Sequence, residues 1–304
     1  MILTCCADLH ITNKTPTNRK DNYFSQVIGK FEFILDVAEK TDSRILLVAG
    51  DFFDSARMPY NVTRLITEML MESKTRILAI PGQHDQRWHG TNLDNTPIGL
   101  LATCKLVTIL KPNQKTIIKG ISFIGAGWGE EPEIEADIVL LHRMIVKKDP
   151  LWFDQTNYST AHSILRKYPF ASCIISGDNH IPHSLKVNGS LQINCGSMMR
   201  SSKNQIGFQP RCYKINTTDW TSKAIKIPCL PAEDVFDLNQ ITISEMKEES
   251  KKIAEEKISE FISTLPKNDR EKPNFKTILN NVVAQVNPKE AVKNIINLTM
   301  ERIS

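Results

Sequence analysis

The sequence predicts an α/β protein with a layered architecture, and three observations support this. Short apolar runs that do not alternate with polar residues recur along the chain, as is typical of strands buried on both faces. Amphipathic helical patterns separate the first of these runs, so that strands and helices alternate. The apolar runs end in polar side chains, and ligands in such folds bind at the carboxyl ends of the strands.

The composition is typical of a soluble globular protein with one large domain, or one large and one small domain. The 304 residues are 41% hydrophobic and 24% charged, and no apolar run is long enough to cross a bilayer. The N-terminus resembles a first strand instead of a signal peptide, so we expect a cytoplasmic protein (in the host cytoplasm if the chain is viral) without a membrane partner. The net charge of +4 permits a polyanionic partner but does not require one.

The seven cysteines occur without a CxxC spacing. Several lie in or beside apolar runs, as expected for reduced cysteines that act as small core residues in a reducing compartment. The alternative, a zinc site built on thiolates, has little support because the usual spacing of such sites is missing.

Predicted strands and helices alternate through the first part of the chain. The predicted strands are residues 2–7, 44–49 and 76–80. Apolar residues at helical spacing predict helices over residues 24–38 and 62–70. The side chains at the ends of these strands that can bind a metal ion are Asp8, His10, Asp51, Gln83 and His84.

The middle of the chain contributes two more strands that end in such side chains. They are residues 137–141, followed by His142, and residues 171–175, followed by Asp178 and His180. Between these strands and the first part of the chain, residues 116–126 are expected to form a hairpin.

The character of the sequence changes after about residue 208. We expect a main domain over residues 1–208, a β-rich, capping-like appendage over residues 209–243 and a helical region over residues 244–304. The last predicted helix is amphipathic. Such a helix usually packs on its own domain, and binding of a partner is the alternative.

Together, the five strand ends supply carboxylate, amide and imidazole groups but no thiolate. This donor set suits Mn²⁺, Fe²⁺ or Zn²⁺, with a preference for the harder ions. Two ions that share a carboxylate hold both the attacking and the leaving oxygen of a phosphoryl group. A single Asp-x-His is more often a surface turn, but its repetition at successive strand ends favours a metal site.

These strand ends resemble the five motifs of the calcineurin-like metallophosphoesterases. The motifs are Asp8-x-His10, Gly50-Asp51-x-x-Asp54, Gly82-Gln83-His84-Asp85, His142 and Gly177-Asp178-x-His180. Three further features look more narrowly like the SbcD-type DNA double-strand-break repair nucleases: the Gly50–Asp54 segment with Pro59, Pro182, and Gly196-Ser197-x-x-Arg200. The resemblance covers residues 1–205 and implies a layered β-sandwich flanked by helices, with a small C-terminal α+β appendage.

The resemblance also implies two divalent metal ions, with Mn²⁺ favoured and Mg²⁺ as the alternative. The first ion would be bound by Asp8, His10, Asp51 and His180. The second would be bound by Asp51, Gln83, His142 and Asp178. His84 would be the catalytic histidine, which orients the scissile phosphate or protonates the leaving oxygen, and Asp85 would orient His84.

Gln83 and Asp178 depart from the family pattern, which usually has Asn at the first position and His at the second. Gln offers the same amide oxygen on a longer side chain. Asp adds a negative charge that favours Mn²⁺ or Mg²⁺ over Zn²⁺. Both departures concern the second metal ion.

Several other side chains have a functional and a structural interpretation. Arg200 is a candidate phosphate ligand, because a guanidinium binds phosphate oxygens bidentately. For His89, a substrate contact and a plain loop position are equal alternatives. For His183, a solvated loop position is favoured over support of the metal pair. Trp88 and Trp128 are candidates for stacking on bases, although loop aromatics more often cover their own core.

We therefore expect a manganese-dependent DNA nuclease, with exonuclease and single-strand endonuclease activity, that acts in DNA repair, recombination or replication. The resemblance implies an SbcC-like, SMC-type ATPase as a partner, bound by the C-terminal helices; a second copy of the chain is another candidate partner. Two alternatives stay open. One is a phosphatase or small-molecule phosphodiesterase of the same superfamily, and the other is a scaffold subunit with weak catalysis.

Overall fold

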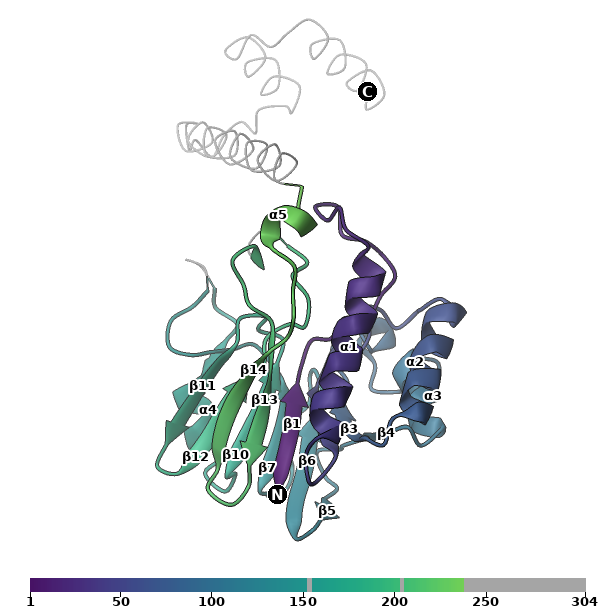
Figure 1. Ribbon diagram of the computed structural model, residues 1–304. Helices are drawn as coiled ribbons and strands as arrows, with labels where there is room; N and C mark the ends of the chain where they lie inside the picture. The colour runs from purple at the N-terminus through teal and green to yellow at the C-terminus, as the bar shows by residue number, and fades with distance from the viewer. Residues whose placement is uncertain (152–154, 203–204, 238–304) are drawn as a thin grey trace, which may run out of the picture. The chain divides into compact units, whose positions relative to one another are not determined.

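The computed structural model describes residues 1–151, 155–202 and 205–237 (Figure 1). The chain divides into two compact units, residues 1–242 and residues 243–304. The predicted helical region over residues 244–304 lies outside the described residues. Within the described part, no helix is both long enough and apolar enough to span a membrane.

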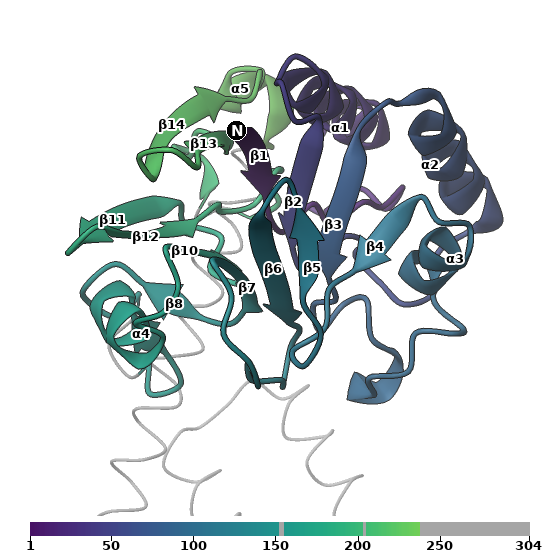
Figure 2. The same cartoon turned by 90° about the horizontal axis from the view of Figure 1, so that it is seen from below.

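The first of the two large sheets contains six strands among the described residues, in the order β14-β13-β1-β2-β3-β4 (Figure 2). In that order, the strands are Thr221–Lys226, Arg211–Asn216, Ile2–Cys6, Ile45–Ala49, Arg76–Ile80 and Val107–Ile109. Strands β1 to β4 run parallel. Such neighbours need crossover connections, which the helices between them supply.

The second sheet also contains six described strands, in the order β11-β12-β10-β7-β6-β5. In that order, they are His183–Val187, Ser190–Asn194, Cys173–Gly177, Ile138–His142, Ile121–Ala126 and Thr116–Ile118. The four central strands are parallel, and the two edge strands are antiparallel to their neighbours. A short parallel pair, β8 (Ile145–Val146) with β9 (Ser159–Thr160), lies outside both large sheets.

Helices cover the outer faces of both sheets (Figure 2). The helices on the first sheet are α1 (Tyr23–Glu39), α2 (Tyr60–Glu72) and α3 (Pro97–Thr103), and the helix on the second is α4 (Ala161–Lys167). The remaining described helices are a 3₁₀ helix at Arg87–His89 and the short α5 at Ala232–Val235. The order of layers is helix, sheet, sheet, helix, which confirms the predicted layered α/β class.

Strand β2 shows why the predicted strands are apolar throughout. Leu46 and Val48 pack in the core beneath α1 and α2. Leu47 and Ala49 pack in the second core, between the two sheets. Because successive side chains point to opposite faces, a strand between two cores needs an apolar residue at every position.

Two other predicted elements are confirmed. The helix expected over residues 24–38 is α1, which begins after Asn22, and the Asn22 side chain accepts a hydrogen bond from the backbone nitrogen of Ser25. The hairpin expected over residues 116–126 is formed by β5 and β6.

The β-rich segment expected as an appendage is instead the edge of the first sheet. Strand β13 pairs antiparallel with β1, from Ile2 opposite Asn216 to Cys5 opposite Tyr213. The buried side chains of Tyr213 and Ile215 join the core between the sheets. Residues 211–226 therefore belong to the layered unit and do not cap it.

The two sheets meet where β2 and β10 end. A Cβ atom on Gly177 would lie 2.2 Å from the carbonyl oxygen of Ala49, so the backbones are in direct contact there. In the second sheet Gly177 pairs with His142 across parallel strands. The carboxyl ends of strands from both sheets thus face one small volume.

Candidate metal centre

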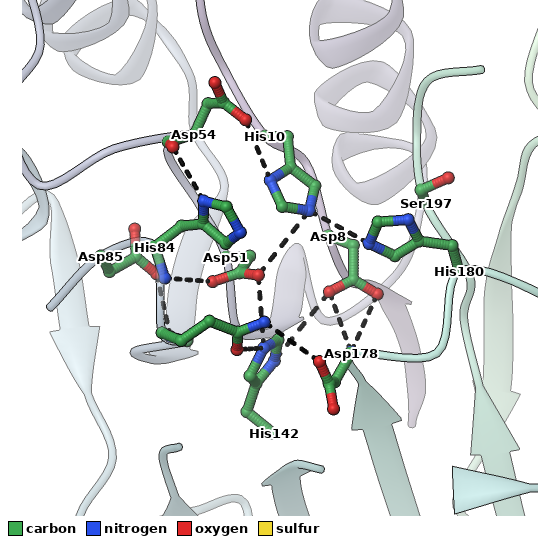
Figure 3. A network of polar contacts seen from close by, with 12 residues as sticks. Asp8, His10, Asp51, Asp54, His84, Asp85, His142, Asp178, His180 and Ser197 are labelled. Atoms are coloured by element: carbon green, nitrogen blue, oxygen red, sulfur yellow. Dashed lines mark hydrogen bonds and ion pairs between the residues drawn. The ribbon is translucent and has the colours of Figure 1, made fainter. Parts of the chain in front are cut away.

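Side chains from five strand ends converge on this volume (Figure 3). They are Asp8 and His10 after β1, Asp51 after β2, Gln83 and His84 after β3, His142 at the end of β7, and Asp178 and His180 after β10. Three groups among the described residues bring their ligand atoms within 4.8 Å of one another: Asp8, His10 and His180; His10, Asp51 and His84; Asp8, Asp51 and His142. Because these groups share members, they form one continuous site.

Four of these residues adopt left-handed backbone conformations. The φ angles are 48° at Asp8, 44° at His10, 47° at Asp51 and 81° at Asp178. L-residues rarely occupy this region, because the Cβ atom is crowded there. Such strain clusters at functional sites, where the surrounding structure holds the side chain in place. Here it turns the chain sharply after each strand and aims the side chain at the centre.

Two glycines leave the space that the site needs. A Cβ atom on Gly50, whose φ is +91°, would lie 1.9 Å from Nδ1 of His142. A Cβ atom on Gly82 would lie 2.1 Å from Oδ1 of Asp51. Both glycines belong to the strand-end motifs, and each makes room for a specific functional side chain, a role that depends on contacts distant in the sequence.

His10 and His180 face each other, with their Nε2 atoms 3.2 Å apart. Only one of the two nitrogens can carry a hydrogen in this contact, so the other presents a lone pair. Burial by itself lowers the pKa of His10, but the hydrogen bond to Asp54 and the charge of Asp51 outweigh burial and raise it. Burial lowers the pKa of His180, which favours its neutral, metal-binding form.

Asp51 lies at the middle of the site. Its Oδ1 accepts a hydrogen bond from the backbone nitrogen of His84 at 2.9 Å. Its Oδ2 is buried without a hydrogen-bond partner, 3.6 Å from Nε2 of His10 and 3.4 Å from Nε2 of His142. A buried carboxylate oxygen without a partner is costly, and a bound cation would satisfy it.

His142, Gln83 and Asp178 form a chain on the other side of Asp51. The Nδ1 atom of His142 donates to the carbonyl oxygen of Ala49 at 2.9 Å, which directs Nε2 at the site. This Nε2 lies 2.7 Å from Oε1 of Gln83, and Nε2 of Gln83 donates to Oδ1 of Asp178 at 3.0 Å. The longer side chain of Gln83 therefore contacts both His142 and Asp178, the two residues expected to lie beside it.

The electrostatic environment of His142 strongly favours positive charge. Burial alone lowers the pKa of His142, but the close contact with Asp51 and the negative charge of Asp51 raise it to about 10. Burial alone raises the pKa of Asp51, but the contact with His142 lowers it to about 2. The carboxylate is therefore ionised, and this negative charge in a buried site attracts cations.

Asp8 joins the two sheets. Its side chain is fully buried, and its two oxygens accept hydrogen bonds from the backbone nitrogen of Asp178 at 2.9 and 3.1 Å. Burial raises the pKa of Asp8 against the opposing effect of His180, His142 and His10. Asp8 thus fixes the end of β10 against the end of β1.

His84 lies at the exposed side of the site, and Asp54 contacts it. The Nδ1 atom of His84 is 2.9 Å from the carbonyl oxygen of Asp54, and its ring stands edge-on to His10 with centroids 4.8 Å apart. The carboxylate of Asp54 lies 3.4 Å from Nδ1 of His10. Asp54 is part of a strand-end motif but had no role among the residues predicted from the sequence. The feature that could have indicated one is its position, since it is a second aspartate three residues after Asp51.

Asp85 does not orient His84, which corrects the expectation from the sequence. Its buried carboxylate accepts hydrogen bonds from the backbone nitrogens of Gly82, Phe52 and Phe53, at 3.0, 3.0 and 2.9 Å. It therefore ties the loop after β3 to the loop after β2. Its role is to hold the loops that carry Asp51 and His84.

Arg200 also differs from its expected role. It is buried, its Nη1 donates to the carbonyl oxygen of Ile206 at 3.0 Å, and its Nη2 donates to that of Leu230. Its backbone oxygen accepts from Arg19, and both guanidiniums lie against the ring of Phe236. We call Arg19, Asp21, Arg200 and Phe236 the arginine cluster. The Arg200 guanidinium thus contacts backbone carbonyls and holds the chain near α5.

Of the two histidines with weaker assignments, the structure describes the side chain of His183 alone. His183 is buried at the start of β11, which differs from the solvated loop position expected for it. His89 ends the 3₁₀ helix, and its side chain lies outside what the structure describes.

The loop after β12 holds two of the candidate metal ligands in place through its backbone. The backbone nitrogen of Ser197 donates to the carbonyl oxygen of His180 at 3.2 Å, and that of Met198 donates to the carbonyl oxygen of Asp8 at 3.1 Å. Gly196, with φ of +71°, allows the close approach to His180 and Pro182. The motif that resembled the repair nucleases thus positions the ligands through its backbone.

The donor set fits divalent cations. Carboxylate, imidazole and amide groups converge, and the ionised Asp51 has an oxygen without a partner between two groups of donors. Bound there, such ions act as Lewis acids on phosphoryl oxygens. The exposed His84 stands beside this centre, within reach of a substrate that approaches from solvent.

Comparison with known proteins agrees with this chemistry. Residues 1–182 match the family model for calcineurin-like phosphoesterases. No match was found among curated proteins.

Three solved structures to which the chain is similar have low sequence identity with it. An archaeal phosphodiesterase is 14% identical, covering 74% of this chain and 99% of that one, with a TM-score of 0.42. A putative 5′-nucleotidase from Staphylococcus aureus is 13% identical, covering 76% of this chain and 54% of that one, with a TM-score of 0.47. The phosphopantetheinyl hydrolase of Mycobacterium tuberculosis is 13% identical, covering 73% and 95%, with a TM-score of 0.41.

Proposed function

The chain belongs to the calcineurin-like phosphoesterases and is a metal-dependent phosphoester hydrolase, and from this premise we propose that it is a two-metal nuclease that cleaves the phosphodiester backbone of DNA. The observation that carries the two-metal assignment is the Oδ2 atom of Asp51, buried and without a hydrogen-bond partner between His10 and His142. A carboxylate in that place is suited to bridge two cations.

The proposed metal ligands form two sets, one on each side of Asp51. We propose that Asp8, His10, Asp51 and His180 bind the first ion, and that Asp51, Gln83, His142 and Asp178 bind the second. The contact between the Nε2 atoms of His10 and His180 supports the first set, and the chain from His142 through Gln83 to Asp178 supports the second. The oxygen-rich second set, with an Asp where the family usually has a His, favours Mn²⁺ over Zn²⁺.

His84 is the proposed catalytic histidine. It is exposed, whereas the other histidines of the site lie deeper, and its Nδ1 is held by the carbonyl oxygen of Asp54. This contact leaves Nε2 to face a substrate. In that position the imidazole orients the scissile phosphate or gives a proton to the leaving oxygen.

The loop after His84 supports DNA as the substrate. Trp88 is 81% exposed and has a left-handed backbone with φ of 53°. The guanidinium carbon of Arg87 lies 4.4 Å from the centroid of its ring. An exposed aromatic ring with an adjacent cation is a common platform for single-stranded nucleic acid, since bases stack on the ring and the cation attracts phosphates.

We further propose an SbcC-like, SMC-type ATPase as the partner. This rests on the sequence resemblance, and its expected contact, residues 244–304, lies outside the described residues. Nuclease activity that depends on added ATPase and ATP would support it. A role in DNA repair, recombination or replication follows from the same resemblance.

The test of the proposed function is cleavage of linear DNA by the purified full chain with Mn²⁺. We expect cleavage by the wild type and a loss of about 100- to 10,000-fold in His84→Ala, the usual contribution of a general acid. His162→Ala is the matched control, because His162 is an exposed histidine on α4. Hydrolysis of a phosphomonoester without cleavage of DNA would establish a phosphatase instead, and equal cleavage of DNA by His84→Ala would overturn the assignment of His84.

A further inference from the structure

The side chain of Asn194, the last residue of β12, is fully buried beside the segment that carries His180. Its Nδ2 donates to the carbonyl oxygen of Asn179 at 2.6 Å and to that of Ile181 at 2.8 Å. These two residues are the neighbours of His180 in the chain. One amide group therefore holds the backbone on both sides of this proposed metal ligand.

Ser176 fixes which way round the Asn194 amide lies. The two residues are opposite each other in the parallel pairing of β10 and β12. The Oγ atom of Ser176 accepts a hydrogen bond from Nε2 of Gln192 at 3.0 Å, so its own hydrogen is left for an acceptor. Oδ1 of Asn194, at 3.0 Å, is nearer to it than the carbonyl oxygen of Ile193, at 3.5 Å. The oxygen of the amide therefore faces Ser176, and its nitrogen faces the His180 segment.

The same segment is also attached to β8. The buried side chain of Asn179 donates from Nδ2 to the carbonyl oxygen of Ile145 at 2.7 Å. Its Oδ1 accepts a hydrogen bond from the backbone nitrogen of Ile181 at 3.0 Å. Buried amide side chains thus hold residues 179–181 between β12 and β8. Such buried hydrogen bonds are costly to break, because the backbone carbonyls would lose their donors.

His142 and His180 are held in different ways. The ring of His142 is oriented by the hydrogen bond from its Nδ1 to the carbonyl oxygen of Ala49. Within the described part of the chain, the hydrogen-bonding contact of the His180 ring is with Nε2 of His10, which is itself a proposed ligand (Figure 3). The second ring nitrogen of a metal-binding histidine usually has a partner that orients it. For His180, the orientation has to come from the backbone that Asn194 holds.

We propose that Asn194 is a positioning residue that fixes His180 for the first metal ion. This inference rests on the proposed function, from which it takes the ligand set of that ion. Asn194 acts through the backbone, since the acceptors of its two hydrogen bonds are carbonyl oxygens. Asp178, by contrast, is held by Asp8 through its own backbone nitrogen. Loss of the Asn194 donors should therefore weaken binding of the first ion more than binding of the second.

The experiment measures Mn²⁺ binding to the full chain by calorimetric titration, at a temperature at which circular dichroism shows every variant to be folded. The variants are Asn194→Ala, His180→Ala and the two changes combined. Residues that orient a ligand typically contribute about 10- to 100-fold to metal affinity, so Asn194→Ala should weaken one of the two Mn²⁺ sites by that factor. His180→Ala should impair the same site. Adding Asn194→Ala to it should cause no further loss, because Asn194 acts through His180.

Two further variants separate positioning from a loss of stability. Ser176→Ala removes one oxygen atom and leaves the Asn194 amide without its fixed orientation, so we expect a loss at the same site of about 10-fold or less. This milder variant decides the question if Asn194→Ala does not fold. Thr41→Val is the matched control, because the buried Thr41 hydroxyl bonds to the backbone of Ala38 and Arg44 at 2.7 and 3.1 Å, before β2 begins. It should lose stability and bind Mn²⁺ as the wild type does.

Wild-type Mn²⁺ affinity in Asn194→Ala or in Ser176→Ala would overturn the inference. An equal loss at both sites, or a further loss when Asn194→Ala is added to His180→Ala, would overturn it as well. The proposed function is tested separately, by cleavage of DNA. A wild type that binds two Mn²⁺ ions and gives the expected pattern of variants without cleaving DNA would contradict the nuclease and support the role of Asn194. A wild type that binds no Mn²⁺ would overturn both.

Discussion

The metal centre and the arginine cluster are both groups of buried, charged side chains, and they are satisfied in different ways. In the arginine cluster, the guanidiniums of Arg19 and Arg200 donate to backbone carbonyls, and Arg19 also pairs with Asp21 at 2.6 Å. In the metal centre, ionised and imidazole groups face one another, and Oδ2 of Asp51 has no hydrogen-bond partner. Guanidiniums that donate to backbone carbonyls hold the chain together, whereas a buried carboxylate oxygen that receives no hydrogen bond is available to a cation.

The largest expected effect is at the centre, with Asp51→Asn. This change keeps the shape of the side chain but removes the negative charge from the proposed bridge between the two ions. We expect a loss of DNA cleavage at least as large as that of His84→Ala, about 100- to 10,000-fold. Calorimetric titration with Mn²⁺ should also show fewer bound ions than in the wild type. Full Mn²⁺ binding by Asp51→Asn would contradict the proposed role of Asp51 as the bridge between the two ions.

The second prediction tests the space around the centre. In Gly50→Ala, the new Cβ would overlap the ring of His142 at 1.9 Å, and alanine would have to adopt a φ of +91°. We expect a loss of about 4 kcal/mol in the free energy of unfolding, from overpacking and from the backbone conformation, together with loss of activity. Gly29→Ala is the matched control.

Gly29 lies inside α1, and no atom lies within 4 Å of the position its Cβ would take. Alanine should stabilise the protein there by about 0.5–1 kcal/mol, because its helix propensity is higher than that of glycine. Urea unfolding of both variants measures the contrast. Similar stability of the two would show that the space beside His142 is not constrained.

The third prediction concerns the arginine cluster. Arg200→Ala removes a buried cation and leaves the carbonyl oxygens of Ile206 and Leu230 without their donor. We expect a loss of about 3 kcal/mol in unfolding free energy, with Mn²⁺ binding retained. If Arg200 instead bound the substrate, the variant would keep its stability and show a raised KM for DNA.

The last prediction concerns Lys30, which lies near the arginine cluster and is buried. Burial lowers the pKa of Lys30 to about 8 from its ordinary value of 10.5, and the charges of Arg19 and Arg200 act in the same direction. Its Nζ makes one hydrogen bond, of 3.4 Å, to the carbonyl oxygen of Met198. The folded state therefore holds the proton of Lys30 less tightly than the unfolded state, so this group destabilises the fold below pH 8.

This lowered pKa makes the contribution of Lys30 to the free energy of unfolding depend on pH. Between about pH 8 and 10.5 the unfolded state binds more protons, so the contribution of Lys30 to stability rises with pH across that range. Lys30→Met should be more stable than the wild type at pH 7 by up to about 3 kcal/mol, and the difference should shrink toward pH 10. Unfolding free energies at several pH values measure this. A difference that does not change with pH would show that the pKa of Lys30 is the same in the folded and unfolded states.

The sequence was sufficient for local features of the fold and of the site. The apolar runs before Asp8, Asp51 and Asp178 predicted strands, and the polar residues after them predicted a convergent site, because parallel strands end at a common edge. Features that depend on distant contacts were not predictable in this way. Nothing local in residues 211–216 indicates pairing with β1, and Arg200 has the same appearance in the sequence whether it binds a phosphate or two backbone carbonyls.

The place of β13 beside β1 has a consequence for how the protein is made. Strand β1 is synthesised about 200 residues before its antiparallel neighbour β13, and such distant pairings form slowly. Until then β1 has an open edge that can pair with another chain. A fragment that ends at residue 208 should therefore be prone to aggregation, and the layered unit should become stable only when synthesis has passed residue 226.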